Sequence, residues 1–528
     1  MDDSFRVSTY NADTRIKMRN LQVSSRAAHW TLPELFVRAG VFANDGGKIP
    51  SVPITSLIDD SRAVHPGACF VAVRGVGRDG HDFVPAAVAS GAAAIVVDRD
   101  GPAPSGVTVV RVADTRSALA KLAPAFYGLL GGVEPTLRII GVTGTNGKTS
   151  VVWLLRSILQ AAQHRTAMLG TVEYDLVGER RASPLTTPGS IELCRSLATA
   201  RDAGATHAVL EVSSHALDQR RCDGLTFAAG VFTNLTGDHL DYHKTMDAYF
   251  SAKQRLFEML PPSAVAVVNV DDPMGALLAR GTTARVVTYG IDSPSAQVRA
   301  GIEGMDRCGT EFLLRGRALE LSIRTPLIGR HNVLNALAAA ATAAAIGVPP
   351  EAIRSGLENV SGVPGRLQRA EPPGWPYSVF IDYAHTDDAL GNVLRTLRLL
   401  TTGTLRCVFG CGGDRDRTKR PRMAAAVGKL SDVAYVTSDN PRTEEPHAII
   451  DEILHGFSPS HACRIVVDVD RKRAIEAALV DSEAGDTVLI AGKGHETYQL
   501  LGDRVLPFDD LEVARKWMNA AALTEEVA

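Results

Sequence analysis

Residues 141–149 read Gly-Val-Thr-Gly-Thr-Asn-Gly-Lys-Thr. They follow the strand-like run 137–140 and precede the apolar, helix-like run 151–159. A strand that ends in glycines and opens a helix directs several backbone N–H groups into one concavity, where the helix dipole also favours negative charge. The stretch therefore predicts a phosphate-binding loop (P-loop) for ATP, in which Lys148 reaches the terminal phosphates and the Thr149 hydroxyl holds Mg²⁺.

The glycine spacing of this loop departs from the usual pattern G-x-x-x-x-G-K-[ST]. Val142 occupies the position of the first glycine, with Gly141 and Gly144 on either side. We interpret the loop as a particular subtype of P-loop. The alternative, a glycine-rich turn that binds nothing, is disfavoured because Gly-Lys-Thr stands between a strand and a helix.

Length and composition define the class of protein. A chain of 528 residues is too long for one core and predicts about three domains. The formal net charge of -3 gives no basic surface for nucleic acid. Seven scattered cysteines fit a reducing cytoplasm, and we interpret the close pair Cys407 and Cys411 as small residues on and after a buried strand. No stretch approaches the ~18–20 apolar residues of a membrane span, and the N-terminus does not resemble a secretion signal, so we expect a cytoplasmic protein.

The sequence pattern divides the chain into three predicted α/β domains. Residues 1–136 form a small N-terminal domain, whose weakly patterned beginning, to about residue 50, is interpreted as an extension. Residues 137–363 alternate strand and helix patterns around the P-loop, which predicts a central ATPase domain with a mostly parallel sheet. Residues 364–528 form the C-terminal domain.

The C-terminal segment contains four apolar runs that each end in a polar cluster. The clusters are Asp382-Tyr383-Ala384-His385, Gly412-Gly413-Asp414-Arg415, Asp439-Asn440-Pro441-Arg442 and Gly492-Lys493-Gly494-His495-Glu496. Ligands of open parallel sheets bind in the crevice outside the carboxyl ends of the strands. The repetition predicts a Rossmann-like domain with a second site that faces the first.

Two further strand-like runs lead to candidate metal ligands. Glu211 follows the run 208–210, and His239 lies after the run 231–232. A carboxylate and an imidazole at neighbouring strand ends beside a P-loop suit Mg²⁺, although Mg²⁺ prefers oxygen ligands. Taken alone, each residue is more readily explained as a cap or a core-edge residue.

Lys253 lies in the middle of an apolar stripe on the predicted helix 246–260. A buried ammonium is costly, so composition favours a lysine that extends its amine to water. The alternative is that the amine is used. A desolvated lysine is more readily neutral, and a neutral amine can add CO₂ to form a carbamate, which is an anionic oxygen ligand for Mg²⁺.

Several of these motifs stand in the order of one known family. They are Gly144 to Thr149, Glu211-Val212-Ser213-Ser214-His215, Thr233-Asn234-Leu235, Asp238 to His243, Asn332 with Asn335, Arg366, Asp382 to His385, and Gly492 to Glu496. Together they resemble the Mur ligases of peptidoglycan synthesis, and among these the ligases that add meso-diaminopimelate to UDP-N-acetylmuramoyl-L-alanyl-D-glutamate. The resemblance extends over about residues 58–508.

The resemblance implies an N-terminal domain for the uridine nucleotide, a central ATPase and a C-terminal domain for the amino acid. It also implies that the D-glutamyl carboxylate attacks the γ-phosphate of ATP, giving an acyl phosphate and ADP, and that the incoming amine then displaces phosphate. A carboxylate is inert to amines until its oxygen becomes a good leaving group, which makes this order reasonable.

The family pattern implies roles for individual residues. Those for ATP are Gly144, Thr145, Asn146, Gly147, Lys148, Thr149, Ser150, Asn335, Arg366 and Asp382. Those for Mg²⁺ and catalysis, besides Lys148, are Thr149 and Glu211 at one ion and His239 with carbamoylated Lys253 at the other. Those for the UDP-linked substrate are Ser61, Val76, Gly77, Arg78, Thr186, Thr187, Ser213, Gln219 and Arg221. Those for diaminopimelate are Arg415, Asp439, Asn440, Pro441, Arg442, Gly492 and Glu496.

We expect the selectivity for the incoming amino acid to depend on the charge of the side chains that bind it. Meso-diaminopimelate differs from lysine by a distal carboxylate, so a selective site places an arginine there and thereby repels a bare ammonium. Asp439-Asn440-Pro441-Arg442 matches the version associated with diaminopimelate, and Arg415 would bind a carboxylate. Taken alone, each arginine is equally explained by a surface ion pair.

Three alternatives remain at this point. A lysine-adding Mur ligase and a folylpolyglutamate synthetase belong to the same superfamily, but the match from Ser61 to Arg78 opposes the latter. A P-loop switch that only binds a partner has no need of the four polar clusters. Asp387 stands where relatives commonly carry proline, which leaves the local loop conformation open. We expect a monomer with no nucleic-acid or membrane partner.

Overall fold

The computed structural model describes residues 30–44, 46, 48–75, 77–101, 105–130, 137–316 and 319–525. The chain forms two compact units. The first contains the chain up to Leu137 together with Pro188–Ala205 and His215–Thr226. The second contains Arg138–Thr187, Thr206–Ser214 and the chain from Phe227 onward.

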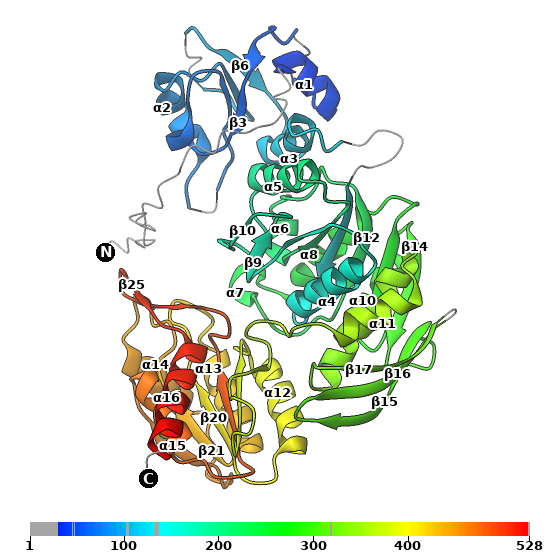
Figure 1. Cartoon of the computed structure of the whole chain (residues 1–528). Helices are drawn as coiled ribbons and strands as arrows, with labels where there is room; N and C mark the ends of the chain where they lie inside the picture. The colour runs from blue at the N-terminus through cyan, green and yellow to red at the C-terminus, as the bar shows by residue number, and fades with distance from the viewer. Residues whose placement is uncertain are drawn as a thin grey trace. The chain divides into compact units, whose positions relative to one another are not determined.

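The first unit is built on a parallel sheet whose strands follow chain order (Figure 1). Its strands are β3 (Ser56–Ile58), β4 (Ala68–Val71), β5 (Ala94–Val97) and β6 (Thr108–Arg111). A small antiparallel pair adds β1 (Trp30–Thr31) and β2 (Pro53–Ile54). The helical segments are α1 (Leu32–Ala39), η1 (Ser61–Ala63), η2 (Gly80–Phe83), α2 (Val84–Ala89), α3 (Thr115–Phe126) and α5 (Ser190–Asp202). Buried Phe70 and Ile95 of the sheet pack with Ala87 of α2.

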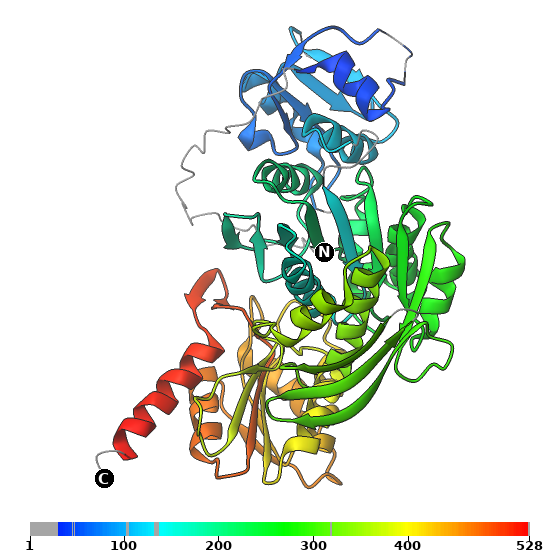
Figure 2. The ribbon, with the colours of Figure 1, turned by 45° about the vertical axis from the view of Figure 1, so that its right-hand side comes forward.

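The second unit begins with an 11-stranded sheet in the order β10-β9-β8-β11-β7-β12-β13-β14-β15-β16-β17. Strands β8, β11, β7, β12, β13, β14 and β15 pair in parallel, and both ends of the sheet are antiparallel. Figure 2 shows β15, β16 and β17 as a long antiparallel extension. The bounds are β7 (Arg138–Thr143), β8 (Thr166–Leu169), β9 (Glu173–Asp175), β10 (Arg180–Ala182), β11 (His207–Glu211), β12 (Phe227–Phe232), β13 (Val265–Asn269), β14 (Arg285–Gly290), β15 (Val298–Asp306), β16 (Gly309–Gly316) and β17 (Leu319–Thr325).

Helices cover both faces of this sheet. Helices α4, α10 and α11 share one apolar core with the central strands. On the other face, Leu256 of α8 contacts the glycines Gly141 and Gly230 of β7 and β12, which have no side chains to obstruct it. The bounds are α4 (Lys148–Ala161), α7 (Leu240–His243), α8 (Met246–Glu258), α9 (Pro273–Arg280), α10 (Arg330–Ala345) and α11 (Pro350–Glu358). Helix α6 (Ser214–Asp218) belongs, apart from Ser214, to the first unit.

A second sheet of the same unit has the order β18-β19-β23-β20-β21-β22, parallel except for β18. Successive residues of its strands enter opposite cores. Phe380 packs with α12, α13 and α14, whereas Val379 and Ile381 pack with α15 and α16. The bounds are β18 (Gln368–Arg369), β19 (Ser378–Asp382), β20 (Leu405–Phe409), β21 (Val433–Val436), β22 (Arg464–Val467), β23 (Thr487–Ala491), α12 (Asp387–Leu400), α13 (Lys419–Leu430), α14 (Pro446–Leu454), α15 (Arg471–Val480) and α16 (Asp510–Glu525). A separate hairpin contains β24 (Tyr498–Leu501) and β25 (Arg504–Pro507).

The predicted α/β class and the mostly parallel central sheet are confirmed. The antiparallel strands β15, β16 and β17 were not predicted from the sequence. Cys407 and Cys411 are buried on and after β20, as expected. Over the residues the structure describes, no helix combines the length and the apolar character needed to span a membrane.

Candidate active site

The loop between β7 and α4 has a shape that its glycines require. Gly144 has φ 151° and Gly147 has φ 88°, which other residues rarely adopt. A Cβ on Gly144 would lie 1.8 Å from Oγ1 of Thr233, and one on Gly147 would lie 2.3 Å from Oδ1 of Asn335. Val142, which breaks the usual spacing, is buried within β7. The unusual spacing therefore leaves intact the two glycine positions that shape the loop.

Residues after β12 hold this loop in place. The N–H of Thr145 donates to the carbonyl of Asn234 (2.8 Å), and the N–H of Asn146 donates to its Oδ1 (2.9 Å). The hydroxyl of Thr233 donates to the carbonyl of Asn146 (2.6 Å). Because the loop is anchored by the neighbouring strand, the first N–H groups of α4 are left to bind an anion at the helix N-terminus.

Two lysines donate to the backbone of the same loop. Nζ of Lys148 donates to the carbonyls of Gly144 (2.9 Å) and Thr145 (2.7 Å), and Nζ of Lys253 donates to that of Gly144 (2.8 Å). Among the described residues, neither ammonium forms an ion pair with a carboxylate. Within the described residues, both amines are therefore bound by backbone oxygens of the loop and by no carboxylate.

Lys253 is 1% exposed, so the expectation that composition favoured, an amine extended to water, is wrong. The reason is that α8 packs against the sheet along the stripe that contains Lys253, and Nζ lies 4.3 Å from the centre of the Tyr249 ring. Burial, and next the charge of Lys148, hold the pKa of Lys253 well below its usual value. This environment favours the neutral amine.

Glu211 lies at the end of β11 and is 1% exposed. Its Oε2 accepts hydrogen bonds from the hydroxyls of Thr149 and Thr171 (both 3.0 Å), and its Oε1 accepts from the N–H of Thr171 (2.7 Å). A carboxylate and a hydroxyl side by side at the P-loop are hard oxygen donors of the kind that Mg²⁺ prefers. Within the part of the chain that the structure describes, no group of three or more His, Cys, Asp or Glu side chains forms a metal site. A metal here needs oxygens from other sources as well.

His239 precedes α7 with φ 56°, a left-handed conformation that is uncommon outside glycine. Its side chain is 42% exposed and lies 3.4 Å from the carboxylate of Asp238. His239, Asp238 and Lys253 line the same cavity as the P-loop.

Arg366 and Asp382 extend the site toward the second sheet. Nη2 of Arg366 donates to the hydroxyl of Thr149 (3.3 Å), and its guanidinium lies 4.5 Å from the ring centre of Tyr383. The carboxylate of Asp382 accepts from the N–H groups of Leu367 and Ala384 (both 2.7 Å). Burial raises the pKa of Asp382, and the charge of Arg366 opposes that rise.

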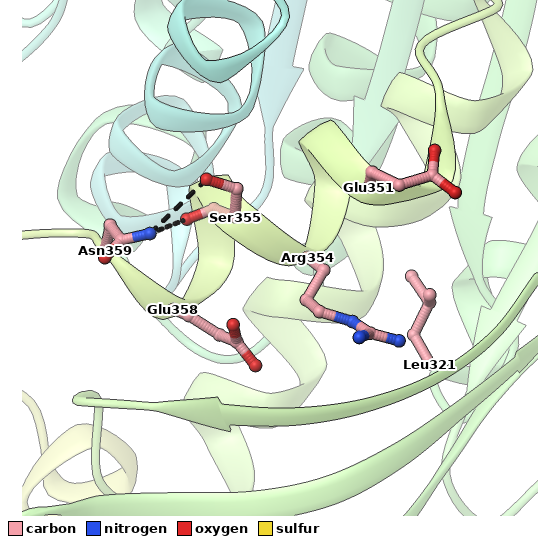
Figure 3. Close-up of a pocket in the computed structure, with 6 residues that line it drawn as sticks. All are labelled: Leu321, Glu351, Arg354, Ser355, Glu358 and Asn359. Carbon is pink, nitrogen blue, oxygen red and sulfur yellow. Dashed lines mark hydrogen bonds between the residues drawn. The ribbon is translucent and has the colours of Figure 1, made fainter.

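These residues line one cavity of about 860 Å³. Its walls carry residues of the P-loop, of α10 including Asn335, and of the segment Asp382–Arg395. A volume of this size suits a nucleotide-sized ligand. A smaller cavity of about 250 Å³ lies between α11 and β17, lined by Arg354, Ser355 and their neighbours, and contains none of the predicted residues (Figure 3).

A second group of charged and polar side chains lies beyond β21 and β23. We call it the paired-charge cluster, and it consists of Asp439, Asn440, Arg442, Lys493 and Glu496. Nζ of the fully buried Lys493 lies 3.2 Å from Oδ1 of Asn440, 3.3 Å from Oε2 of Glu496 and 3.9 Å from Asp439. Nδ2 of Asn440 donates to Oε2 of Glu496 (2.9 Å). Burial raises the pKa of Glu496, whereas the charge of Lys493 lowers it.

The two predicted arginines lie at the edge of this cluster. Arg442 has φ 52°, and its Nη1 donates to the carbonyl of Gly413 (2.7 Å). Arg415 is exposed in the loop after β20. The preceding residue, Asp414, accepts from the hydroxyl of Thr443 (2.7 Å), which joins the loop of Arg415 to that of Arg442.

Two fully buried arginines, each paired with carboxylates, support the cluster. Arg471 of α15 and Asp510 of α16 are both fully buried, 2.7 Å apart, and Nη2 of Arg471 also donates to the carbonyl of Ala491 (2.9 Å). Arg420 of α13 is fully buried and pairs with Glu444 and Glu452, each at 2.8 Å. These pairs fix the strand ends and loops that carry the cluster.

The residues predicted for the UDP-linked substrate fall in both units. In the first unit, Ser61 begins η1, and the N–H of Gly75 donates to the carbonyl of Arg78 (2.8 Å). Also in the first unit, Nη2 of Arg221 donates to Gln219 (2.8 Å). Gly77 belongs to the loop before Arg78, and Val76 lies outside the described residues.

In the second unit, the hydroxyl of Thr187 donates to the carbonyl of Glu211 (2.8 Å) and accepts from the N–H of Ser213 (3.0 Å). Thr186 lies 3.1 Å from the hydroxyl of Thr171. These three predicted residues are thereby joined to the ligands expected for the metal.

Comparison with known proteins gives the same order of domains along the chain as the sequence motifs. Residues 53–127 match the model of the Mur ligase family catalytic domain, residues 142–343 that of the Mur ligase middle domain, and residues 365–494 that of the Mur ligase glutamate ligase domain. The chain is 44% identical over 489 residues to UDP-N-acetylmuramoyl-L-alanyl-D-glutamate--2,6-diaminopimelate ligase from Geobacter metallireducens, covering 88% of this chain and 94% of that protein. It is also 44% identical over 481 residues to the ligase of the same name from Bacillus cereus, covering 90% and 96%.

This chain belongs to the Mur ligase family.

Solved structures agree with this assignment. A structure of UDP-N-acetylmuramoyl-L-alanyl-D-glutamate--2,6-diaminopimelate ligase superimposes with a TM-score of 0.67 at 33% identity, covering 94% of this chain and 99% of the other. MurF from Acinetobacter baumannii shares the fold, with a TM-score of 0.62 at 21% identity, covering 89% and 96%.

The structure of this Mur ligase also shows residues that sequence reasoning missed. Thr171 bonds both carboxylate oxygens of Glu211, Tyr249 covers Lys253, and Oδ2 of Asp388 accepts from Nδ2 of Asn146 (3.1 Å). Thr171 follows a glycine after β8, which gave no distinctive signal. Tyr249 stands one helical turn before Lys253, and this spacing could have indicated that the two side chains lie together.

The departure at Asp387 has a simple structural account in this Mur ligase. Asp387 is the first residue of α12, after the N-cap Thr386, whose hydroxyl accepts from the N–H of Ala389 (3.2 Å). Proline is favoured at this helix position, and an acidic residue also suits it because the helix N-terminus carries partial positive charge. Asp387 is therefore compatible with the usual N-terminus of a helix.

Proposed function

We propose that this Mur ligase uses ATP to join meso-diaminopimelate to the D-glutamyl carboxylate of UDP-N-acetylmuramoyl-L-alanyl-D-glutamate. The single observation that carries the proposal is the similarity to diaminopimelate-adding ligases over 88% of the chain. The cavity at the P-loop and the paired-charge cluster would supply the two sites that such a reaction needs.

The P-loop cavity is suited to activating a carboxylate. Lys148 and the N-terminus of α4 would bind the phosphates of ATP, and Arg366, which already contacts Thr149, would offset charge on the transferring phosphoryl group. The substrate carboxylate oxygen bonds to the γ-phosphorus while the bond to the β–γ bridging oxygen breaks, giving an acyl phosphate and ADP. Asn335 and Asp382 line the same cavity and would fix the nucleotide.

Thr149 and Glu211 would hold one Mg²⁺, and His239 with Lys253 would hold another. Mg²⁺ would neutralise charge on the phosphates and align them for in-line transfer. The oxygen donors of Thr149 and Glu211 fit this ion, whereas the amine of Lys253 does not in its unmodified form.

We propose that Lys253 acts as its carbamate. The neutral amine attacks the carbon of CO₂, an N–C bond forms, and one proton leaves to solvent. Burial lowers the pKa of Lys253 and so favours the neutral amine, and the product is an oxygen donor whose negative charge would face the ammonium of Lys148.

The carbamate is tested by Lys253→Ala. We expect loss of nearly all activity and partial recovery with a short carboxylic acid together with bicarbonate, because a free carboxylate can occupy the vacated space. Full activity of Lys253→Ala would remove the carbamate from the mechanism.

The paired-charge cluster would hold the incoming amino acid. Arg442 and Arg415 carry the positive charges for carboxylates, and Glu496 with the backbone of Gly492 would take the distal ammonium and carboxylate. Asp439, Asn440 and Pro441 shape this loop. The amine of diaminopimelate adds to the acyl carbon, and the tetrahedral intermediate then expels phosphate and loses a proton.

The remaining assignments are proposals of the same kind. Ser61, Val76, Gly77, Arg78, Thr186, Thr187, Ser213, Gln219 and Arg221 would contact the UDP-linked substrate. The domain limits 1–136, 137–363 and 364–528, a monomeric state and a cytoplasmic location complete the proposal.

Phosphate release with the UDP-linked dipeptide tests the proposed function. We expect release to depend on meso-diaminopimelate and to be much slower with lysine. Equal stimulation by the two amino acids would favour a ligase of broader choice and contradict the role of Arg442. No stimulation by either would contradict the ligase.

A further inference from the structure

The hairpin β24–β25 is exposed and joins neither large sheet. Within the described residues, β25 pairs only with β24. Val505 is 65% exposed and Leu506 is 40% exposed. An isolated two-stranded hairpin is marginally stable in water, so its conformation depends on what it contacts.

The strand β24 lies against the loop that carries the paired-charge cluster. Nε2 of Gln499 donates to the carbonyl of Asp439 (2.7 Å), and the N–H of Leu500 donates to Oδ1 of Asn440 (3.0 Å). The same Oδ1 lies 3.2 Å from Nζ of Lys493. One end of the hairpin thus fixes Asn440 between β24 and the buried ammonium.

The other end of the hairpin holds the backbone of Arg442. Its N–H donates to the carbonyl of Leu500 (3.1 Å), and its carbonyl accepts from the N–H of Gly502 (2.7 Å). Arg442 and Leu501 form an isolated parallel bridge. Both backbone groups of Arg442 are therefore satisfied by the hairpin.

This support matters because Arg442 has φ 52°, a strained conformation for an arginine. Such a conformation persists only where the surroundings determine it. Here it sets the direction of the side chain, whose Nη1 reaches the carbonyl of Gly413 (2.7 Å). Without the hairpin, the backbone can relax to an ordinary conformation and redirect the guanidinium.

We propose that the hairpin β24–β25 is the positioning element for amino-acid specificity, because it fixes the backbone of Arg442 and the side-chain amide of Asn440. This inference rests on the proposed function, in which Arg442 recognises a carboxylate of the incoming amino acid. The hairpin acts through Arg442 and Asn440 and takes no part in the reaction itself.

The test compares Gln499→Leu and Gly502→Val with the wild-type enzyme. Gln499→Leu removes the donor to Asp439 at similar size, and Gly502→Val places a β-branched residue at φ 54°, where the turn needs glycine. For Gln499→Leu we expect KM for meso-diaminopimelate to rise about tenfold. Gly502→Val should raise it further. KM for ATP should stay unchanged, and the preference for meso-diaminopimelate over lysine should fall with the rise in KM.

Val505→Thr is the matched control, because Val505 lies on the exposed strand of the same hairpin and should leave all constants unchanged. If both hairpin variants keep the wild-type preference, or if KM for ATP rises by the same factor, the hairpin is merely structural and the inference is overturned. Arg442→Lys separates the two proposals. If Arg442→Lys loses the preference while the hairpin variants keep it, only the hairpin inference fails. If Arg442→Lys keeps the preference, the proposed role of Arg442 fails as well.

Discussion

The P-loop site and the paired-charge cluster both lie at the carboxyl ends of parallel strands, but they handle charge in opposite ways. At the P-loop, within the part of the chain that the structure describes, Lys148 and Lys253 donate only to backbone carbonyls. In the cluster, Lys493 lies beside the carboxylates of Glu496 and Asp439, and Arg471 pairs with Asp510 behind it. One region leaves its lysines on backbone oxygens, and the other places its lysine beside carboxylates.

The difference matches the ligands that we propose. ATP and the acyl phosphate bring several negative charges, and Lys148 can bind them without breaking an ion pair. Diaminopimelate carries both signs, so its site needs donors and acceptors fixed in advance at defined positions. We call the P-loop region the trap, because its lysine is bound only by backbone oxygens within the described residues, and the paired-charge cluster the template, because its groups are fixed by one another.

Removing a cation from the trap should have the largest effect. For Lys148→Met we expect kcat to fall by roughly 10³-fold, because a donor to the transferring phosphoryl group is lost. KM for diaminopimelate should not change. Steady-state phosphate release measures both constants. The control is Lys516→Met on α16, where the lysine side chain is 73% exposed. If kcat of Lys148→Met falls by less than about tenfold, the proposed role of the lysine in the trap is contradicted.

Removing one partner of the buried ion pair behind the paired-charge cluster should reduce the stability of the folded protein. Arg471→Met leaves the fully buried Asp510 without its partner, and we expect a loss of about 3–5 kcal/mol in the free energy of unfolding. Urea denaturation measures it. The neighbouring Lys472→Met, whose side chain is 61% exposed, should change stability by less than about 1 kcal/mol. Equal losses in the two variants would show that the buried pair has no special role.

The smallest expected effect concerns His495, which lies between the two regions. Burial, and then the charges of Arg366 and Lys493, lower its pKa to about 3. An unfolded histidine titrates near 6.5, so between about pH 3 and 6.5 the unfolded state binds more protons and stability rises with pH. His495→Gln should reduce the slope of that rise by about 1 kcal/mol per pH unit, measured by urea denaturation across this range. An unchanged slope would show that His495 is not kept neutral by its surroundings.

Local patterns predicted much of this molecule. The glycines and Gly-Lys-Thr indicated the P-loop because its conformation depends on adjacent residues. The four polar clusters predicted that polar side chains gather at the edge where parallel strands place their carboxyl ends, and the paired-charge cluster lies there. The helical stripe around Lys253 placed it in the packed face of α8, although the buried amine contradicted the explanation that composition favoured.

Contacts between distant residues could not be predicted. Arg471 and Asp510 stand 39 positions apart, and each reads as an ordinary surface charge in a helical pattern. The hairpin β24–β25 was not predicted from the sequence, and nothing in its residues indicates that it bonds the backbone of Arg442. Pairing of this kind depends on tertiary packing, which overrides local propensity.

The central claim is that the P-loop region activates the substrate carboxylate before the amine held by the cluster attacks it. The most direct test uses UDP-N-acetylmuramoyl-L-alanyl-D-glutamate labelled with ¹⁸O in the D-glutamyl carboxylate. Mass spectrometry of the phosphate released with ATP and meso-diaminopimelate should find one ¹⁸O atom transferred from the substrate. Phosphate that carries no substrate oxygen would contradict the account, because ATP would then have been cleaved by water and not by the carboxylate.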